Sequence, residues 1–224
     1  EYYRQAADQD YAPGMCNLAV CYMNGNGVEQ DPAQAVPWLE RAAEQGFPRG
    51  LYLLGLCYRD GEGVAQDQTG AVELFRRAAE RGYLPAICDL GLCYEGGEGV
   101  EQDLPQAAAQ YRRAAEEGYA PAQCNLGYCY LSGMGVKHDA AAAVEWLEKA
   151  AAQNYPRALR LLGCCCQNGD GVEMDERRAF TLLEKAADLG NISAVCDLGL
   201  CYELGSGIQP DLERAQALYL QAAQ

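Results

Sequence analysis

The sequence is short of histidine, of large aromatic side chains other than Tyr, and of positive charge. It has one His, two Trp and three Phe, and its 17 Lys and Arg stand against 32 Asp and Glu, which gives a formal net charge of −15. Proteins that bind nucleic acid draw much of their affinity from Lys and Arg contacts to phosphate. We therefore expect no nucleic acid among the partners of this chain.

Long hydrophobic runs and a leader segment are also missing. The longest apolar runs span only a few residues, as at Leu51 to Leu56, whereas a bilayer-spanning helix needs about 20 apolar residues. We therefore expect no membrane insertion.

The chain opens Glu1-Tyr2-Tyr3-Arg4, with no initiating Met and no signal-peptide pattern, and we interpret it as a piece of a longer protein. A composition that is half hydrophobic and 22% charged is typical of a folded chain.

The residues that most enzyme mechanisms need are scarce. Any nucleophile paired with a histidine would depend on His138, which lies in a loop beside Asp139. The Gly-x-Gly-Val segments lack the Lys and the Ser or Thr that complete a phosphate-binding loop. We predict that the chain is not an enzyme, and we expect no catalytic residue and no cofactor.

What the sequence does have is an internal repeat with a constant step of 36 residues (61 − 25 = 36). The string Gly-x-Gly-Val or Gly-x-Gly-Ile begins at Gly25, Gly61, Gly97, Gly133, Gly169 and Gly205. An Asp follows each string at the position of Asp31, and the pair Ala42-Ala43 recurs with the same step. Six copies without an insertion predict a single repeated structural unit.

Each copy has the pattern of two helices joined by a glycine loop. The first helix is expected near Pro13 to Asn24, and paired glycines break it because they accept positive φ. Asp31 is expected to cap the second helix, which should end near Gly46. The Ala columns permit close helix packing. Hairpins of this kind bury their apolar faces by stacking, which predicts an all-α solenoid.

The fourth copy resembles the Sel1-like repeat, a relative of the tetratricopeptide repeat. The matching residues are Ala122, Asn125-Leu126-Gly127, Tyr130, Gly133, Gly135-Val136, Asp139, Ala143 and Ala150-Ala151. The resemblance covers essentially the whole chain and implies a right-handed α-solenoid of six 36-residue helix-turn-helix repeats. It also implies an adaptor that binds other proteins, in signalling and cell-envelope assemblies, and it does not imply catalysis.

The phase of the repeat sets the expected domain organisation. Residues 1–8 match the end of a preceding repeat's second helix, and residues 9–224 are expected to form one continuous array of six repeats. Neither end has the atypical polar repeat that usually caps a solenoid. We therefore expect the array to continue, or to be flanked, beyond this piece.

Three positions depart from the repeat pattern. Cys166 stands in a column of Tyr, Asn154 replaces the Gly that ends a second helix, and Asn191 replaces an aromatic residue. Asn tolerates the left-handed backbone conformation better than most residues. We expect these changes to alter local packing rather than the architecture.

Twelve cysteines raise the question of disulfides and metal sites. Most lie in two columns, one through Cys21 and one through Cys16, and equivalent positions in neighbouring repeats lie roughly 8–10 Å apart, beyond disulfide reach. Cys-x-x-Cys spacing is absent, and Cys164-Cys165-Cys166 point in three directions on a helix. We expect buried, reduced thiols, no disulfides and no metal.

The resemblance to tetratricopeptide repeats places the partner on a concave face formed by the first helices. The implied positions are the two residues before each Leu-Gly pair and the residue after it, a column that varies from copy to copy. They are Cys16, Asn17, Val20, Tyr52, Leu53, Leu56, Cys88, Asp89, Leu92, Cys124, Asn125, Tyr128, Arg160, Leu161, Cys164, Cys196, Asp197 and Leu200. Tyr52 and Tyr128 are candidate anchors, and Asn17 and Asn125 are candidates for hydrogen bonds to a peptide backbone. The alternative is that these side chains pack only against the adjacent repeat.

Three functions remain open from the sequence. The first is a scaffold that binds a protein or peptide of unknown identity on the concave face. The second is a regulatory or targeting region of a larger, bacterial signalling protein. The third is a thiol-based sensor or metal-binding protein.

Reduced cysteines favour a cytoplasmic location, although a secreted or periplasmic one stays open. The acidic loops are expected to be solvated surface, with a basic partner as the alternative.

Overall fold

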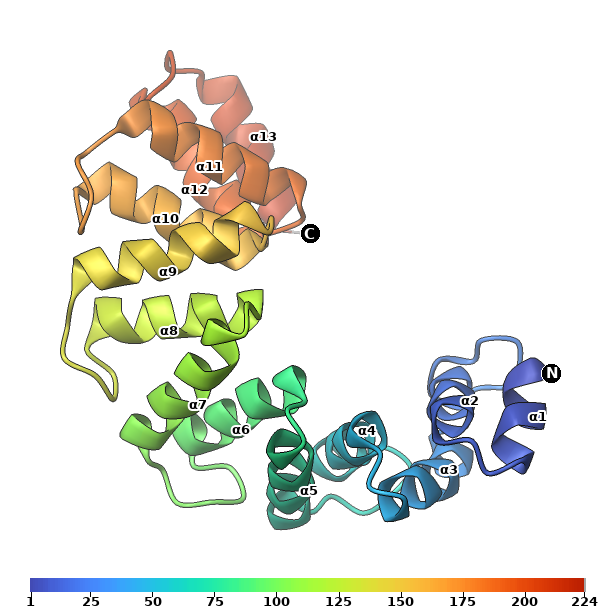
Figure 1. Ribbon diagram of the computed structural model, residues 1–224. Helices are drawn as coiled ribbons and strands as arrows, with labels where there is room; N and C mark the ends of the chain where they lie inside the picture. The colour runs from blue at the N-terminus through green and yellow to red at the C-terminus, as the bar shows by residue number, and fades with distance from the viewer. Residues whose placement is uncertain (224) are drawn as a thin grey trace. The chain divides into compact units, whose positions relative to one another are not determined.

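The structure is a computed structural model that describes residues 1–223, so Gln224, the last residue of the expected sixth repeat, lies outside the described residues. Every helix or strand assigned within residues 1–223 is an α-helix (Figure 1). The prediction of an all-α repeat fold is confirmed.

A short helix, α1 (Tyr2–Asp8), precedes six helical hairpins. The first helices of the hairpins are α2 (Ala12–Asn24), α4 (Pro48–Asp60), α6 (Leu84–Gly96), α8 (Ala120–Ser132), α10 (Pro156–Asn168) and α12 (Ile192–Leu204). The second helices are α3 (Pro32–Glu44), α5 (Gln68–Glu80), α7 (Leu104–Glu116), α9 (Ala140–Ala152), α11 (Glu176–Asp188) and α13 (Leu212–Ala222). None of these described helices has the length and hydrophobicity needed to cross a bilayer.

The chain groups into two compact units, and the boundary falls within α7. Unit 1 is residues 1–110 and contains the first helices α2, α4 and α6; unit 2 starts at residue 111 and contains α8, α10 and α12. Each unit therefore holds the first helices of three repeats. The continuous array over residues 9–224, and the origin of residues 1–8 in a preceding repeat, stay predictions.

The hairpins begin and end as the repeat pattern indicates. Gly25 follows α2 in the left-handed conformation with φ of 72°, and its N–H donates to the Cys21 carbonyl. The second helix α3 is capped by Asp31, whose side chain accepts a hydrogen bond from the Ala33 N–H at 3.1 Å. These caps satisfy backbone groups that a helix end leaves without partners.

The second glycine of several loops has a further role, which was not predicted from the sequence. A Cβ on Gly63 would lie 2.3 Å from the Pro32 carbonyl oxygen, and a Cβ on Gly99 would lie 2.1 Å from the Gln68 carbonyl oxygen. The loop of one repeat thus rests on the first turn of the preceding second helix. Only glycine leaves room for this contact.

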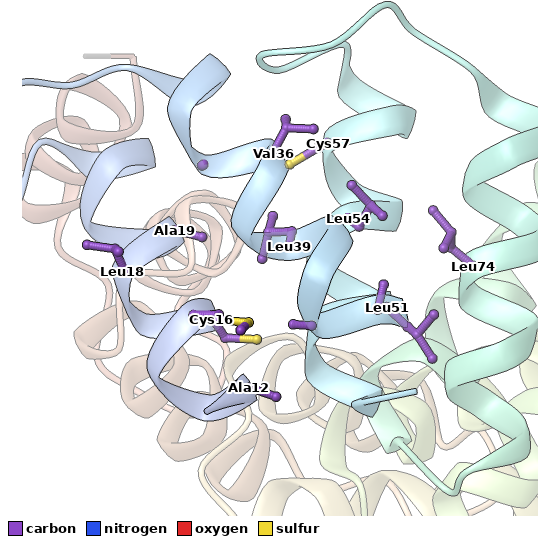
Figure 2. Close-up of a cluster of buried hydrophobic side chains, with 14 of the residues drawn as sticks. Ala12, Cys16, Leu18, Ala19, Val36, Leu39, Leu51, Leu54, Cys57 and Leu74 are labelled. Carbon is purple, nitrogen blue, oxygen red and sulfur yellow. The ribbon is translucent and has the colours of Figure 1, made fainter. Parts of the chain in front are cut away.

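The core lies between the first and second helices. Figure 2 shows Leu39 of α3 together with Leu51 and Leu54 of α4, and each of these three side chains is at most 5% exposed. The Ala columns give the close approach that was expected, since a Cβ on Gly50 would lie 2.7 Å from the Cβ of Ala42.

The three departures from the repeat leave the helices in place. Asn154 takes a φ of 59°, as expected for a substitute for glycine. Asn191 caps α12, because its side chain accepts a hydrogen bond from the Ala194 N–H at 2.8 Å. Cys166 is fully buried. The cap at Asn191 was not predicted.

Candidate functional site

The residues predicted for the partner-binding face fall into three groups by exposure. Four of them are exposed, namely Leu92, Tyr128, Cys196 and Leu200. Four are buried: Cys16, Cys88, Cys124 and Asn125. The others are half-buried: Asn17, Val20, Tyr52, Leu53, Leu56, Asp89, Arg160, Leu161, Cys164 and Asp197.

The prediction that Cys16, Cys88 and Cys124 line an accessible face is wrong. Their exposed fractions are 0%, 3% and 0%, and Figure 2 shows Cys16 among the core side chains. These small side chains are covered by the neighbouring helices and behave as core residues. Asn125, at 8% exposed, is also covered, and its Oδ1 accepts a hydrogen bond from Arg157 Nη1 at 2.7 Å.

In unit 1 the middle first helix, α4, is bonded through its side chains to both neighbouring first helices. Arg49 Nη1 donates to Asn17 Oδ1 of α2 at 2.9 Å. The Tyr52 hydroxyl donates to Asp89 Oδ2 of α6 at 3.2 Å, and Arg59 Nη1 lies 3.5 Å from the same oxygen. The polar groups of Asn17, Tyr52 and Asp89 are thus engaged inside the protein.

Unit 2 repeats this arrangement through α10. Arg157 donates to Asn125 of α8, and Arg160 Nε donates to Asp197 Oδ2 of α12 at 2.6 Å. Arg160 and Asp197 are 30% and 27% exposed. Pairs at this exposure contribute about 0–1 kcal/mol, so they align the helices more than they stabilise them.

Three of the predicted side chains, Asn17, Tyr52 and Asp89, therefore have mainly structural contacts. The Tyr52 ring lies 5.3 Å from the Tyr83 ring and 5.8 Å from the Phe75 ring, between centroids. Burial raises the pKa of the Asp89 carboxyl, and Arg59 partly opposes that shift by lowering the pKa. For Tyr52, Asn17 and Asp89, packing against the adjacent repeat describes the structure better than an open binding position does.

Arg49 and Arg157 were not among the residues predicted from the sequence. Each lies in the first turn of a middle first helix, where the neighbouring first helices of the same unit carry Pro13 and Pro85, or Pro121 and Ser193. Two arginines at one repeat position, three repeats apart, were the signal that would have identified them.

One column of the predicted set contains three exposed apolar or aromatic side chains and three half-buried ones. Leu92, Tyr128 and Leu200 are 44%, 37% and 46% exposed. We call this column the first-helix face. It consists of Val20, Leu56 and Leu92 in unit 1 and of Tyr128, Cys164 and Leu200 in unit 2. The Tyr128 ring is held by Arg157, whose guanidinium carbon lies 5.5 Å from the ring centroid.

The thiols are free within the described residues, and most are buried. Burial raises the pKa of Cys16, Cys57, Cys93, Cys124 and Cys165 to about 11. No group of three or more His, Cys, Asp or Glu side chains within residues 1–223 is arranged to hold a metal ion. Protonated, covered thiols do not suit a sensor that needs accessible thiolates.

A hollow of about 1070 Å³ lies between two loops of unit 2. Residues 172–178 line one side of it and residues 205–209 much of the other, and its charged side chains include both Glu173 and Glu176 and both Arg177 and Arg178. It is separate in sequence from the first-helix face, and its mixed charges do not specify a ligand.

Stacked hairpins with buried Ala and Leu columns define a helical-repeat protein of the α-solenoid class. The Sel1 repeat family model matches residues 1–11, 12–47, 48–83, 84–119, 120–155, 156–191 and 192–224. The chain therefore belongs to the Sel1 repeat family, as the resemblance predicted. Repeats of this family generally act as protein–protein interaction scaffolds. No curated protein sequence matches the chain significantly.

Solved structures of bacterial Sel1 repeat proteins are similar to this chain. A Sel1 repeat protein from Oxalobacter formigenes has a TM-score of 0.89 and 32% identity, over 96% of this chain and 86% of its own. The c5321 protective antigen of uropathogenic Escherichia coli has a TM-score of 0.83 and 35% identity, over 99% of this chain. This chain spans 48% of that antigen. The immunity protein Pa5087 from Pseudomonas aeruginosa, at 23% identity and a TM-score of 0.58 over 84% of this chain and 72% of its own, shares the fold.

Proposed function

We propose that this chain is a non-catalytic scaffold that binds a protein or peptide through the first-helix face. The observation that carries the proposal is the exposure of apolar side chains at one repeat position, with Leu92, Tyr128 and Leu200 between 37% and 46% exposed. Most side chains of the adjacent columns on the same helices are buried or internally bonded, and Cys196 is the exposed member of the predicted set outside that position. Within each unit, apolar side chains at one repeat position of neighbouring first helices form a surface of the kind that solenoids use for recognition.

The surface proposed here is narrower than the one predicted from the sequence. Cys16, Cys88 and Cys124 contribute to the core, and Asn17, Asp89, Asn125, Arg160 and Asp197 use polar atoms to join neighbouring helices. Leu53 and Leu161 also pack against core clusters. Binding energy is expected from the first-helix face itself, with Tyr128 as the aromatic anchor.

A wider role as the regulatory or targeting region of a larger bacterial protein is a second candidate. It is supported by the length of the Escherichia coli antigen, of which this chain spans 48%.

The proposed compartment is a reducing one such as the cytoplasm, because the thiols in the helix columns are free and mostly buried.

The proposal is tested by capture of partners on immobilised protein from the native cell. Leu92→Ala and Tyr128→Ala together should remove a captured partner, because they delete accessible apolar contacts at the first-helix face. Leu189→Ala is a matched control, since Leu189 is 45% exposed and lies at the end of α11, outside that face. Partners that bind the double variant as well as the wild type, with both proteins folded by circular dichroism, would remove the first-helix face as the binding surface.

A further inference from the structure

The outward face of α13 differs in burial from the same face of the other second helices. On those helices the side chains at the repeat position of Tyr219 are each 0% exposed: Leu39, Phe75, Tyr111, Leu147 and Leu183. They lie on the side that packs against the first helix of the next hairpin, as α3 packs against α4. Within the described residues no first helix follows α13, and Tyr219 is 38% exposed.

Two substitutions on this face do not suit a further hairpin of the same kind. Gln216 stands in a column whose other members are buried and apolar, namely Val36, Val72, Ala108, Val144 and Phe180. Leu220, which is 60% exposed, stands in a column that is charged on every other hairpin. From that column Arg112 Nη2 donates to the hydroxyl of Tyr130, on the next first helix, at 2.8 Å. The outward face of α13 therefore has a different chemistry from the internal packing faces.

The same part of α13 carries no charge. Residues 215–223 contain no Asp, Glu, Lys or Arg, whereas each equivalent segment of the five other hairpins has at least two. Those segments are residues 35–43, 71–79, 107–115, 143–151 and 179–187. Two copies of a chain with a formal net charge of −15 repel each other. An uncharged face with exposed leucines is where two copies approach at the least electrostatic cost.

The exposed side chains of α13 form a stripe that is complementary to itself. Leu212, Gln216, Tyr219 and Ala223 are exposed, and their spacing of four, three and four residues places them on one side of the helix. We call these four residues the α13 stripe. When two stripes run antiparallel about a two-fold axis, residue 212 faces residue 223 of the partner and residue 216 faces residue 219.

This antiparallel register pairs side chains that fit each other. A large leucine meets a small alanine at each end, and opposed helix dipoles attract. In the middle, the Gln216 amide donates to the Tyr219 hydroxyl oxygen of the partner. That oxygen is available as an acceptor, because the hydroxyl uses its proton to donate to Glu203 Oε2 at 2.7 Å.

We propose that two copies of this chain dimerise through antiparallel pairing of their α13 stripes. The surface is separate from the first-helix face, so a dimer presents that face twice and gains avidity for a partner with repeated binding segments. An 11-residue helix is about 16 Å long. The pair therefore buries less than the ~1,200–2,000 Å² of a stable interface, and the dimer is weak and depends on concentration.

The test is sedimentation velocity of the full chain from about 5 μM to about 500 μM, over which a weak dimer should accumulate. The double variant Leu212→Glu and Leu220→Glu gives α13 the glutamates that α11 has at the same repeat positions, Glu176 and Glu184. It should fold, as checked by circular dichroism, and weaken dimerisation at least about tenfold, because like charges enter the uncharged face.

A matched control adds the same charge elsewhere in unit 2. Met174→Glu and Leu189→Glu change side chains that are 64% and 45% exposed and lie outside α13. This variant should dimerise as the wild type does. Equal loss of the dimer in the control would show that added charge alone weakens association, and would overturn the assignment to α13.

Cysteine crosslinking tests the register in a Cys196→Ser background, which removes the exposed native thiol. Chains with Leu212→Cys and chains with Ala223→Cys are mixed and oxidised with copper-phenanthroline. The mixture should give far more disulfide dimer than either variant alone, because equivalent residues of an antiparallel pair lie about 16 Å apart at these positions. Equal yields from each variant alone would overturn the antiparallel register.

The remaining outcomes also decide the question. A monomer over the whole range, or a dimer that the double glutamate variant leaves unchanged, overturns the inference. A monomer that loses a captured partner in that variant would show that another protein, and not a second copy, covers α13. None of these results touches the proposed scaffold function, because Leu92 and Tyr128 lie outside α13.

Discussion

At the scale of single residues, the cysteines show how position decides chemistry. Cys57, Cys93 and Cys165 lie in one column, and desolvation raises the pKa of each thiol to about 11. Cys196 stands in the other column and is exposed, whereas Cys16, Cys88 and Cys124 of that column are buried. One residue type thus supplies both covered core atoms and an accessible thiol.

Native labelling should separate these thiols. At pH 8 a thiol with a pKa of about 11 is roughly one part in a thousand thiolate, so Ellman's reagent should modify Cys196 quickly and the buried column very slowly. Unfolding in denaturant without a reductant should then release all twelve thiols. Recovery of clearly fewer than twelve would contradict the prediction of a fully reduced protein. Fast native labelling of the Cys57 column would contradict its burial.

At the scale of helices and loops, the two glycines of a Gly-x-Gly segment have different structural roles. The first glycine ends a first helix, and Gly25 has a φ of 72° for that purpose. In several loops the second glycine also lets the loop rest on the preceding hairpin, as Gly99 does on Gln68. The sequence predicted the helix ends because positive φ is a local property. The second contact joins residues that are far apart in the chain, so local pattern reasoning did not reveal it.

Gly27 and Gly99 form a matched pair for this contact. Both have a positive φ, 72° and 69°, but a Cβ on Gly27 meets no atom within 4 Å, whereas one on Gly99 would lie 2.1 Å from the Gln68 carbonyl oxygen. Gly27→Ala should lower the free energy of unfolding by about 1–2 kcal/mol, from backbone strain alone. Gly99→Ala should cost about 1–3 kcal/mol more, because the loop must move. Urea denaturation followed by circular dichroism measures both, and equal losses would refute the contact.

The same distinction between local and distant contacts explains which residues of the candidate site were predicted correctly and which were not. The repeat fixed which columns belong to the first helices, and the exposed members Leu92, Tyr128 and Leu200 were in the predicted set. The burial of Cys16 and the hydrogen bond from Arg49 to Asn17 depend on how neighbouring hairpins pack against each other. Periodicity gives the face of a helix, and only packing shows which residues on that face are covered.

At the scale of the whole chain, two units each present one stretch of the first-helix face. Their carboxylates outnumber their basic groups, and the chain has a formal net charge of −15. The proposed binding at this face requires no change in the helical hairpins, since Leu92, Tyr128 and Leu200 are already exposed.

Site-specific photo-crosslinking tests this central claim most directly. Tyr128→p-benzoylphenylalanine places a crosslinker on the first-helix face, and Leu189→p-benzoylphenylalanine places one at a position that is 45% exposed but outside it. After irradiation in the native cell, we predict discrete crosslinked partner bands from position 128 that are absent from position 189. The same bands from both positions, or bands from position 189 alone, would contradict recognition through the first-helix face.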